Sequence, residues 1–452
     1  MASLRMILQS TIKICLFFLL ALIPLVVNPT AYDYFYKPKI DSVYGLICIV
    51  CAAVLARFFM CRVAFSIPRL SGTVFLFLYG CSAIISTALS IDRNLSLHGD
   101  FLRDEGLFTL LAYVFLVVIF AGLVESRMQA EQLVKWLLVS TVLVSLYGLI
   151  QYLGFNPTRH FIESFNVNNV INSTMGNGNF LGKFLVLTGP LFAGYCLYKN
   201  EKKTYLLCSS ALVFVLIALV LSMARASWVG FACSALLFSC LAFRYGGAEQ
   251  KKYLAFMAAA IAGGVLVFLV FSASGFGSFN IGSRIAAKAR AAFNLQQGYG
   301  SATRLFIWRK AVPLIVERPW FGYGPDTHVK VYKDVSLESF KRFKTLGILD
   351  RAHNNYIDIA IGQGLFGLFA YCGIVVSFLV WLWRRMKSEP DRRLRMLLYA
   401  VFSSYCGYLV NDFFSFSVAS VSPTFWALMG LTYALQRSDT SDAMHPPGAA
   451  IL

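Results

Sequence analysis

Long apolar runs recur along almost the whole chain and limit its fold more than any other feature. Each run can cross a bilayer as a helix, which needs roughly 20 apolar residues. The twelve or so expected spans are 11–28, 42–60, 71–90, 106–124, 134–153, 179–198, 205–222, 226–244, 253–273, 364–384, 395–412 and 416–436. Helices satisfy their own backbone hydrogen bonds, so we expect an all-α polytopic membrane protein, with 1–452 as a single membrane domain. The low charged fraction of 14% agrees, since soluble chains carry about 25%.

The distribution of lysine and arginine predicts which side of the membrane each loop faces. With the N-terminus in the cytoplasm, 20 of the 40 basic residues lie on the cytoplasmic side and 6 lie in the short outer loops. Both chain ends, including a short tail at 437–452, are therefore expected in the cytoplasm. A long loop at 274–352, between the ninth and tenth spans, is expected to face outward. The histidines on that outer side are His98, His160, His328 and His353.

The long loop carries helical signals of its own. Segment 282–293 has the alanine content of a short basic helix, and segment 303–316 places Leu305 and Trp308 on one side of a second helix. We expect these short amphipathic helices to lie on the outer leaflet and cap the bundle. The loop holds 13 basic and 5 acidic residues, a net charge of +8. That charge suits an anionic partner, either lipid headgroups or a phosphorylated substrate, and the alternative is a solvated basic surface.

Two arginines are candidate phosphate ligands. Arg225 lies in LSMARASWVG, where almost no loop separates two apolar spans, and a charge near membrane depth usually has a partner. Arg304 lies in the long loop, one helical turn before Trp308. A guanidinium group offers a planar fork of donors that matches phosphate oxygens. The alternatives are that Arg225 extends to the outer headgroups and that Arg304 anchors an interfacial helix.

Arg103 is a third and weaker candidate, because the adjacent Asp104 and Glu105 could simply pair with it. We find no Asp-x-Asp pair and no His/Cys/carboxylate cluster with the spacing of a metal site, so neither a metal nor another cofactor is expected. If the protein handles phosphate, arginine must supply the positive charge that a metal supplies elsewhere.

His353 is the candidate catalytic residue. It lies in RAHNNYIDIAIGQG, where the long loop meets an apolar run. Imidazole, with its usual pKa near 6.5, is the natural general base at neutral pH. Asp350 and Asp358 are near enough in sequence to orient the ring. The alternative is that His353 caps a helix or satisfies a carbonyl group.

Several of these stretches together resemble the O-antigen ligase and polymerase superfamily of bacterial cell-surface polysaccharide assembly. The similar stretches run in family order over roughly 75–432. They are STALSIDRNLSLHGDFLRDEGLFT, GNGNFLGKF, LSMARASWVG, TRLFIWRKAVPLIVERPWFGYGPDTH and RAHNNYIDIAIGQGLFGL. One departure is Gly178, where proline is common. The resemblance implies a GT-C-like, metal-independent and inverting glycosyltransferase of the bacterial inner membrane, with its active site facing the periplasm.

The resemblance also implies an activity and its partners. A glycan would pass from undecaprenyl pyrophosphate to an acceptor hydroxyl on the lipid A core or another surface anchor. Arg225 and Arg304 would hold the pyrophosphate, with Arg103 as a lesser candidate, and His353 would be the base at the acceptor hydroxyl. The implied partners are the carrier-linked donor, a lipid or glycan acceptor and membrane lipids, and no nucleic acid is expected.

Two alternatives remain open. A polymerase of the same superfamily would join carrier-linked repeat units, and it shares these motifs; the spacing of the Arg225, Arg304 and His353 elements favours a ligase. A lipid-linked glycan flippase would also have many spans with both chain ends inside. Transporters are expected to show charged or broken helices near mid-membrane and short loops. Here the polar groups gather on the outer side beside one long loop, which favours outer-face chemistry.

Overall fold

The computed structural model describes residues 2–31, 33–63, 70–101, 103–155, 171–273, 301–343 and 349–436. Every regular element within these ranges is helical, so the predicted all-α class is confirmed. The helices are α1 (Ala2–Phe17), α2 (Lys37–Cys61), α3 (Thr73–Ala88), α4 (Arg93–His98), α5 (Leu107–Leu123), α6 (Arg127–Tyr152), α7 (Gly178–Lys199), α8 (Lys202–Leu221), α9 (Arg225–Tyr245), α10 (Ala248–Ala273), α12 (Ser301–Glu317), α13 (His328–Val331), α14 (Lys333–Phe343), α15 (Asn355–Ser388), α16 (Arg392–Asp412) and α17 (Ser422–Ala434). The predicted helix at 282–293, His160 and the tail at 437–452 lie outside the described residues.

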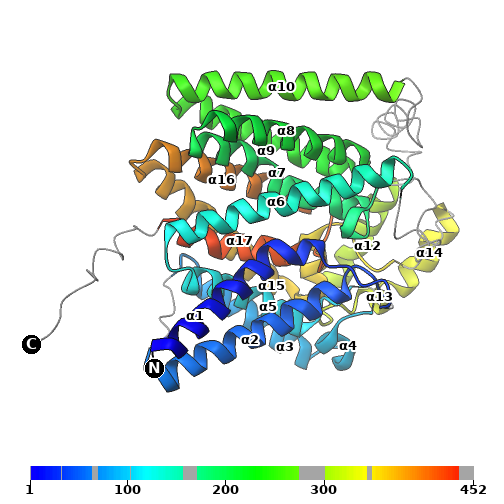
Figure 1. Cartoon of the computed structure of the whole chain (residues 1–452). Coiled ribbons are helices and arrows are strands. Elements are labelled where there is room, and N and C mark those ends of the chain that lie inside the picture. The colour runs from blue at the N-terminus through cyan, green and yellow to red at the C-terminus, as the bar shows by residue number, and fades with distance from the viewer. Residues whose placement is uncertain are drawn as a thin grey trace, which may run out of the picture.

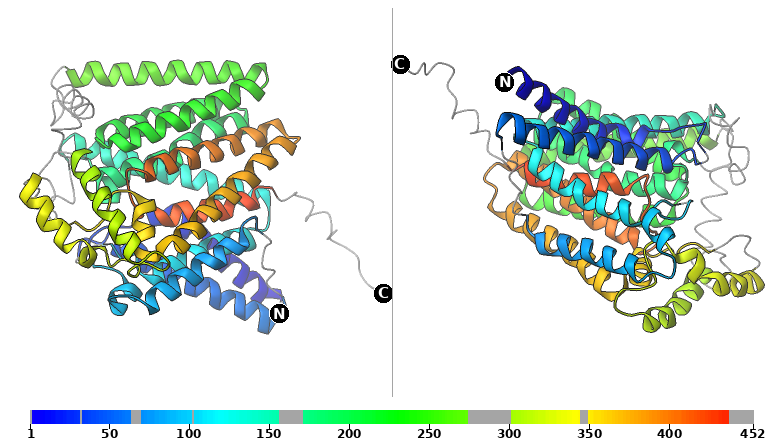
Figure 2. Two further views of the ribbon diagram at one scale, coloured as in Figure 1. Left: turned by 180° about the vertical axis from the view of Figure 1, so that it is seen from behind. Right: turned by 90° about the horizontal axis from the view of Figure 1, so that it is seen from below.

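The long helices lie side by side as a bundle (Figure 1). Helix α16 packs against α7 and α9, α17 packs against α5, and α15 packs against α3. Helices α12, α13 and α14 lie together at one end of the bundle, and α1 begins at the opposite end (Figures 1 and 2). The predicted helix over 303–316 is thus present as α12.

Each predicted span overlaps a helix, but the count of twelve spans is not confirmed. Among the described residues, seven helical segments are long and apolar enough to cross a membrane: Ser3–Leu25, Lys37–Cys61, Arg127–Tyr152, Gly178–Lys199, Lys202–Leu221, Arg225–Tyr245 and Asn355–Ser388. Helices α3 and α5 are apolar but have only 16 and 17 residues. Helix α17 has 13 residues, and α16 begins with Arg392, Arg393 and Arg395. The protein is therefore a multi-span membrane protein, and the full count stays a prediction.

Glycines allow the helices α7, α9 and α16 to pack closely against one another. A Cβ atom at Gly230 of α9 would lie 2.6 Å from the carbonyl oxygen of Gly407 of α16, which leaves no room for a side chain. A Cβ atom at Gly182 of α7 would similarly lie 2.5 Å from Ser227 Oγ. The close crossing brings Ser227 next to Asn411, whose Nδ2 donates to Ser227 Oγ at 2.8 Å.

Helix α15 is broken at Gly364, which has φ 72° and ψ −176°. The chain that follows α12 is hydrogen-bonded into this break. The Leu365 N–H donates to the Pro319 carbonyl at 2.6 Å, and the Tyr323 N–H donates to the Ile361 carbonyl at 2.9 Å. These hydrogen bonds fix the short first part of α15 against the chain at 319–324.

Candidate functional site

A cavity of about 70 Å³ lies at the end of the bundle that carries α12. It brings together residues from six distant parts of the sequence. Its lining residues are Arg103, Asn177, Asn179, Phe180, Ala226, Ser227, Arg304, His353, Asn411, Phe414, Ser415 and Phe416. Three of the four residues predicted for the site, Arg103, Arg304 and His353, therefore share one cavity. The fourth, Arg225, immediately precedes Ala226 at the start of α9.

Arg225 and Arg304 form a pair of neighbouring positive charges. Burial, followed by the charge of Arg225, lowers the pKa of the Arg304 guanidinium group. Within the described ranges, neither arginine forms an ion pair with a carboxylate. Helix α9 also begins at Arg225 without a side-chain cap, because Ala224 occupies the N-cap position. Two unpaired guanidinium groups beside an uncapped helix start make a site that an anion would stabilise.

Arg103 differs from these two because it is already paired. Its Nε and one terminal nitrogen each lie 2.6 Å from Asp350 Oδ2, and its guanidinium group lies over the Phe416 ring at 5.0 Å. Burial raises the pKa of Asp350, but Arg103 and then Arg351 outweigh burial and hold that pKa below its ordinary value. The alternative in which Arg103 pairs with its sequence neighbours Asp104 or Glu105 is therefore wrong.

His353 lies on the wall of the cavity, with its ring centroid 5.3 Å from that of Phe416. Its backbone is left-handed, with φ 55°. Burial, followed by the charge of Arg304, lowers the pKa of His353 to about 4. The imidazole is therefore neutral near pH 7. Among the described residues its ring nitrogens make no hydrogen bond, so neither Asp350 nor Asp358 orients the ring in this way.

The turn that holds His353 is fixed by its neighbours. The Trp308 side chain donates to the Ala352 carbonyl at 2.9 Å, and the Ala352 N–H donates to Asp358 Oδ1 at 2.7 Å. Asn354, not His353, caps α15, because its side-chain oxygen accepts the Tyr356 N–H at 3.0 Å. Anchoring on both sides keeps His353 in its strained conformation, while its ring nitrogens bond to none of the described residues.

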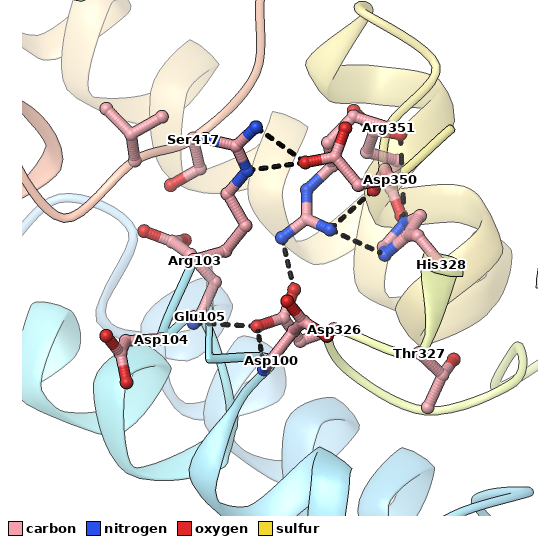
Figure 3. A network of polar contacts seen from close by, with 12 residues as sticks. Asp100, Arg103, Asp104, Glu105, Asp326, Thr327, His328, Asp350, Arg351 and Ser417 are labelled. Atoms are coloured by element: carbon pink, nitrogen blue, oxygen red, sulfur yellow. Dashed lines mark hydrogen bonds and ion pairs between the residues drawn. The ribbon is translucent and has the colours of Figure 1, made fainter. Parts of the chain in front are cut away.

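Asp326 joins the segment that carries Arg103 to the segment that carries His353, and sequence reasoning assigned it no role. Figure 3 shows its carboxylate at the centre of the network. One oxygen accepts the N–H groups of Asp100 at 2.7 Å and Glu105 at 2.9 Å, and the other pairs with Arg351. The only sequence signal was its place in the quoted stretch GYGPDTH.

The other predicted histidines take different positions. His328 is buried, with Nε2 2.9 Å from the Asp358 carbonyl oxygen and Nδ1 3.4 Å from an Arg351 nitrogen. Burial, followed by the charge of Arg351, lowers the pKa of His328 to about 4. Both of its ring nitrogens face partners, which assigns it to the scaffold. His98 packs beside Phe108 at a ring distance of 5.5 Å.

A second cavity, of about 60 Å³, shares Phe416 with the first. Its polar lining includes Glu105, Asp326, His328, Arg351, Asn355, Asp358, Asp412 and Ser417. Tyr113 donates to Glu105 at 2.7 Å, and burial raises the pKa of Glu105 to about 7. Beside it, the buried Lys183 pairs with Asp412 and donates to the Phe416 carbonyl at 2.7 Å, which holds the Phe416 turn in place. No group of three metal-ligating side chains is found in the described part of the chain.

The fold and this site define a helical membrane protein with a cavity that brings Arg103 and Arg304 beside a neutral histidine. Residues 210–372 match the sequence model of the O-antigen ligase family, which confirms the predicted resemblance to this family. That range contains Arg225, Arg304 and His353.

Two curated relatives have names that present them as presumed polysaccharide ligases. The protein of Rickettsia conorii (strain ATCC VR-613 / Malish 7) is 23% identical over 235 residues, 52% of this chain and 52% of the relative. The protein of Rickettsia bellii (strain RML369-C) is 23% identical over 321 residues, 69% of this chain and 71% of the relative. The match thus spans about half the length of the first relative.

Proposed function

We propose that this protein is an O-antigen ligase-type glycosyltransferase. It moves a glycan from undecaprenyl pyrophosphate to an acceptor hydroxyl, on the lipid A core or another surface anchor, at the outer face of the bacterial inner membrane. One observation carries the proposal: Arg304, which neighbours Arg225 and has no carboxylate partner among the described residues, shares a cavity with a neutral histidine that has no hydrogen-bond partner among those residues. The family match over 210–372 supports the same activity.

The arginines stabilise the leaving group. When the bond between the anomeric carbon and the pyrophosphate breaks, its electron pair leaves with the pyrophosphate and negative charge develops there. Arg225 and Arg304 neutralise that charge, and they act strongly because both are partly shielded from water. Arg103 contributes less, since Asp350 already balances its charge.

His353 removes the proton of the acceptor. The acceptor oxygen attacks the anomeric carbon from the face opposite the pyrophosphate, which inverts the anomer, and its proton passes to the imidazole. The pKa of His353 is about 4 in the free site, partly because of Arg304. A bound pyrophosphate offsets the charge of Arg304, so the pKa rises toward its ordinary value and the imidazole becomes a stronger base when the donor is present.

The product of a purified reaction tests this function. The protein is mixed with carrier-linked glycan and either an anchor acceptor or a second carrier-linked glycan. A ligase gives a single transfer to the anchor and free carrier pyrophosphate. A ladder of carrier-linked products would instead identify a polymerase. Movement of the intact carrier-linked glycan across vesicles, without any new glycosidic bond, would identify a flippase.

A further inference from the structure

A buried amide oxygen in the wall of the site has no hydrogen-bond partner among the described residues. Asn411, near the end of α16, lines the cavity with His353 and Arg304 and has a relative exposure of 1%. Its Nδ2 donates to Ser227 Oγ at 2.8 Å. Its Oδ1 has no hydrogen-bond partner among the described residues. A buried acceptor without a donor is unfavourable, so this position calls for a ligand that brings a donor hydrogen.

The position of this amide is fixed by the scaffold. Helices α9 and α16 touch through the backbones of Gly230 and Gly407, and the Asn411 Cβ lies against the same glycine contact. The bond to Ser227 then sets the plane of the amide. Asn411 is therefore held in one orientation before any substrate arrives, as a recognition group needs to be.

The group that would bond to Asn411 Oδ1 must be a hydrogen-bond donor, which a pyrophosphate is not. An ionised pyrophosphate only accepts hydrogen bonds, and the arginines of the cavity supply donors for it. An amide oxygen instead needs a hydroxyl or an amide N–H. In the proposed donor those groups belong to the sugar, which is joined directly to the pyrophosphate and so must lie beside the arginines.

We infer that Asn411 recognises the sugar next to the pyrophosphate, through a hydrogen bond from a hydroxyl or acetamido N–H of that sugar to Asn411 Oδ1. This inference rests on the proposed function and adds to it a determinant of donor specificity. It distinguishes glycosylated carrier, the substrate, from bare carrier pyrophosphate, the product.

Two probes test the inference: a short-chain polyprenyl pyrophosphate, and the same lipid bearing one hexose. The wild type is expected to bind the glycosylated probe about tenfold more tightly than the bare one, the effect of one satisfied buried acceptor. Asn411→Leu should remove this preference while keeping affinity for the bare probe. Asn411→Asp keeps an acceptor oxygen, so the preference should persist even though the added charge weakens both probes.

Ser404→Ala is the matched control, because Ser404 is buried on the same helix, two turns from Asn411 and outside the cavity lining. It should keep the wild-type preference. An unchanged preference in Asn411→Leu would overturn the inference. A loss of affinity for both probes in Asn411→Leu, and a larger loss in Asn411→Asp, would also overturn it by showing that the amide contacts phosphate. A rise only in the acceptor KM of Asn411→Leu would assign the hydroxyl to the acceptor and contradict the donor-sugar contact.

The outcomes separate this inference from the proposed function. If the wild-type protein binds neither probe, the proposed function fails. If it binds both probes equally, only the role of Asn411 fails. Thermal unfolding of each variant in the same lipid shows whether a loss of binding reflects a loss of folding.

Discussion

Two cavities share Phe416 in their linings, and the histidine of each cavity is partnered differently. In the cavity of about 60 Å³, the ring nitrogens of His328 face partners and Arg351 pairs with Asp326. In the cavity of about 70 Å³, Arg304 and His353 have no such partners among the described residues. A buried group with all its partners stabilises the fold, whereas an unpaired group is available to a ligand.

The contrast assigns a role to each side of Phe416. The cavity of about 60 Å³, here called the paired cavity, belongs to the scaffold. Its Asp326–Arg351 pair holds the turn in which His353 follows Arg351 by two residues. Under the proposed function, the cavity of about 70 Å³, here called the unpaired cavity, is the site of reaction. Neither residue type nor pKa distinguishes His328 from His353, because burial lowers the pKa of both to about 4. Only their hydrogen-bond partners differ.

The largest effect is expected from exchanging the two histidines for alanine. His353→Ala should lower the transfer rate by about 10²–10⁴-fold, the usual contribution of a general base, with little change in carrier binding. His328→Ala should mainly lower the unfolding temperature, because it leaves buried partners unsatisfied. Transfer rates, carrier affinities and unfolding curves check both results. Wild-type turnover by His353→Ala would exclude it as the base.

Removal of either unpaired arginine should weaken donor binding. Arg225→Ala and Arg304→Ala are each expected to lower carrier-pyrophosphate affinity by about 10–100-fold, the range for charge-assisted hydrogen bonds. Arg225→Lys should restore only part of it, since an ammonium group lacks the planar fork. Arg309→Ala, exposed on the same helix as Arg304, should bind like the wild type. Full rescue of Arg225 by lysine would reduce its role to simple charge.

Asp326 tests whether the paired cavity positions the base. Asp326→Asn breaks the buried pair with Arg351, so it should cost about 3 kcal/mol of unfolding free energy. The base turn then shifts, and kcat should fall by as much as about 10²-fold while the donor Kd stays near the wild-type value. Asp334→Asn, on an exposed acid of α14, serves as the control. A loss of stability with unchanged kcat would make Asp326 purely structural.

The pH profile sharpens the comparison at Arg304. The acid limb of kcat/KM reports the pKa of the base in the free enzyme, which is about 4 for His353. The positive charge of Arg304 disfavours the imidazolium form, so Arg304→Gln should raise the pKa and move the acid limb to higher pH, toward the ordinary 6.5. An acid limb that stays in place, or moves to lower pH, would contradict this coupling.

The smallest effect is expected from chelation. If arginines alone neutralise the leaving pyrophosphate, EDTA should leave the transfer rate unchanged. The assay compares chelated protein with protein supplied with Mg²⁺ or Mn²⁺. Activity lost on chelation and restored by a divalent ion would show that the arginines are insufficient.

Much of the architecture could be predicted from the sequence because it depends on local pattern. Apolar runs predicted the helices, and the near absence of a loop around Arg225 predicted a charge at a tight turn between two spans. The charged site residues could be proposed because histidine is scarce in this chain and arginine is chemically distinctive in apolar surroundings. The grouping of Arg103, Arg304 and His353 on one cavity agrees with that proposal.

The remaining contacts join residues that are distant in sequence, and no local pattern indicates them. Asp350 rather than Asp104 pairs with Arg103, across 247 positions. Asn411 meets Ser227 only because two helices cross at glycines. The break at Gly364 is filled by the chain after α12, which a hydropathy profile does not reveal. Even the number of spans depends on packing, since short helices can lie within the bundle.

The most direct test of the unpaired cavity is an experimental structure of the protein with polyprenyl pyrophosphate bound. We expect the pyrophosphate between the guanidinium groups of Arg225 and Arg304, with the His353 ring on the same cavity wall and the Asp326–Arg351 pair intact. A pyrophosphate bound elsewhere, with Arg225 and Arg304 directed to lipid headgroups, would contradict the account.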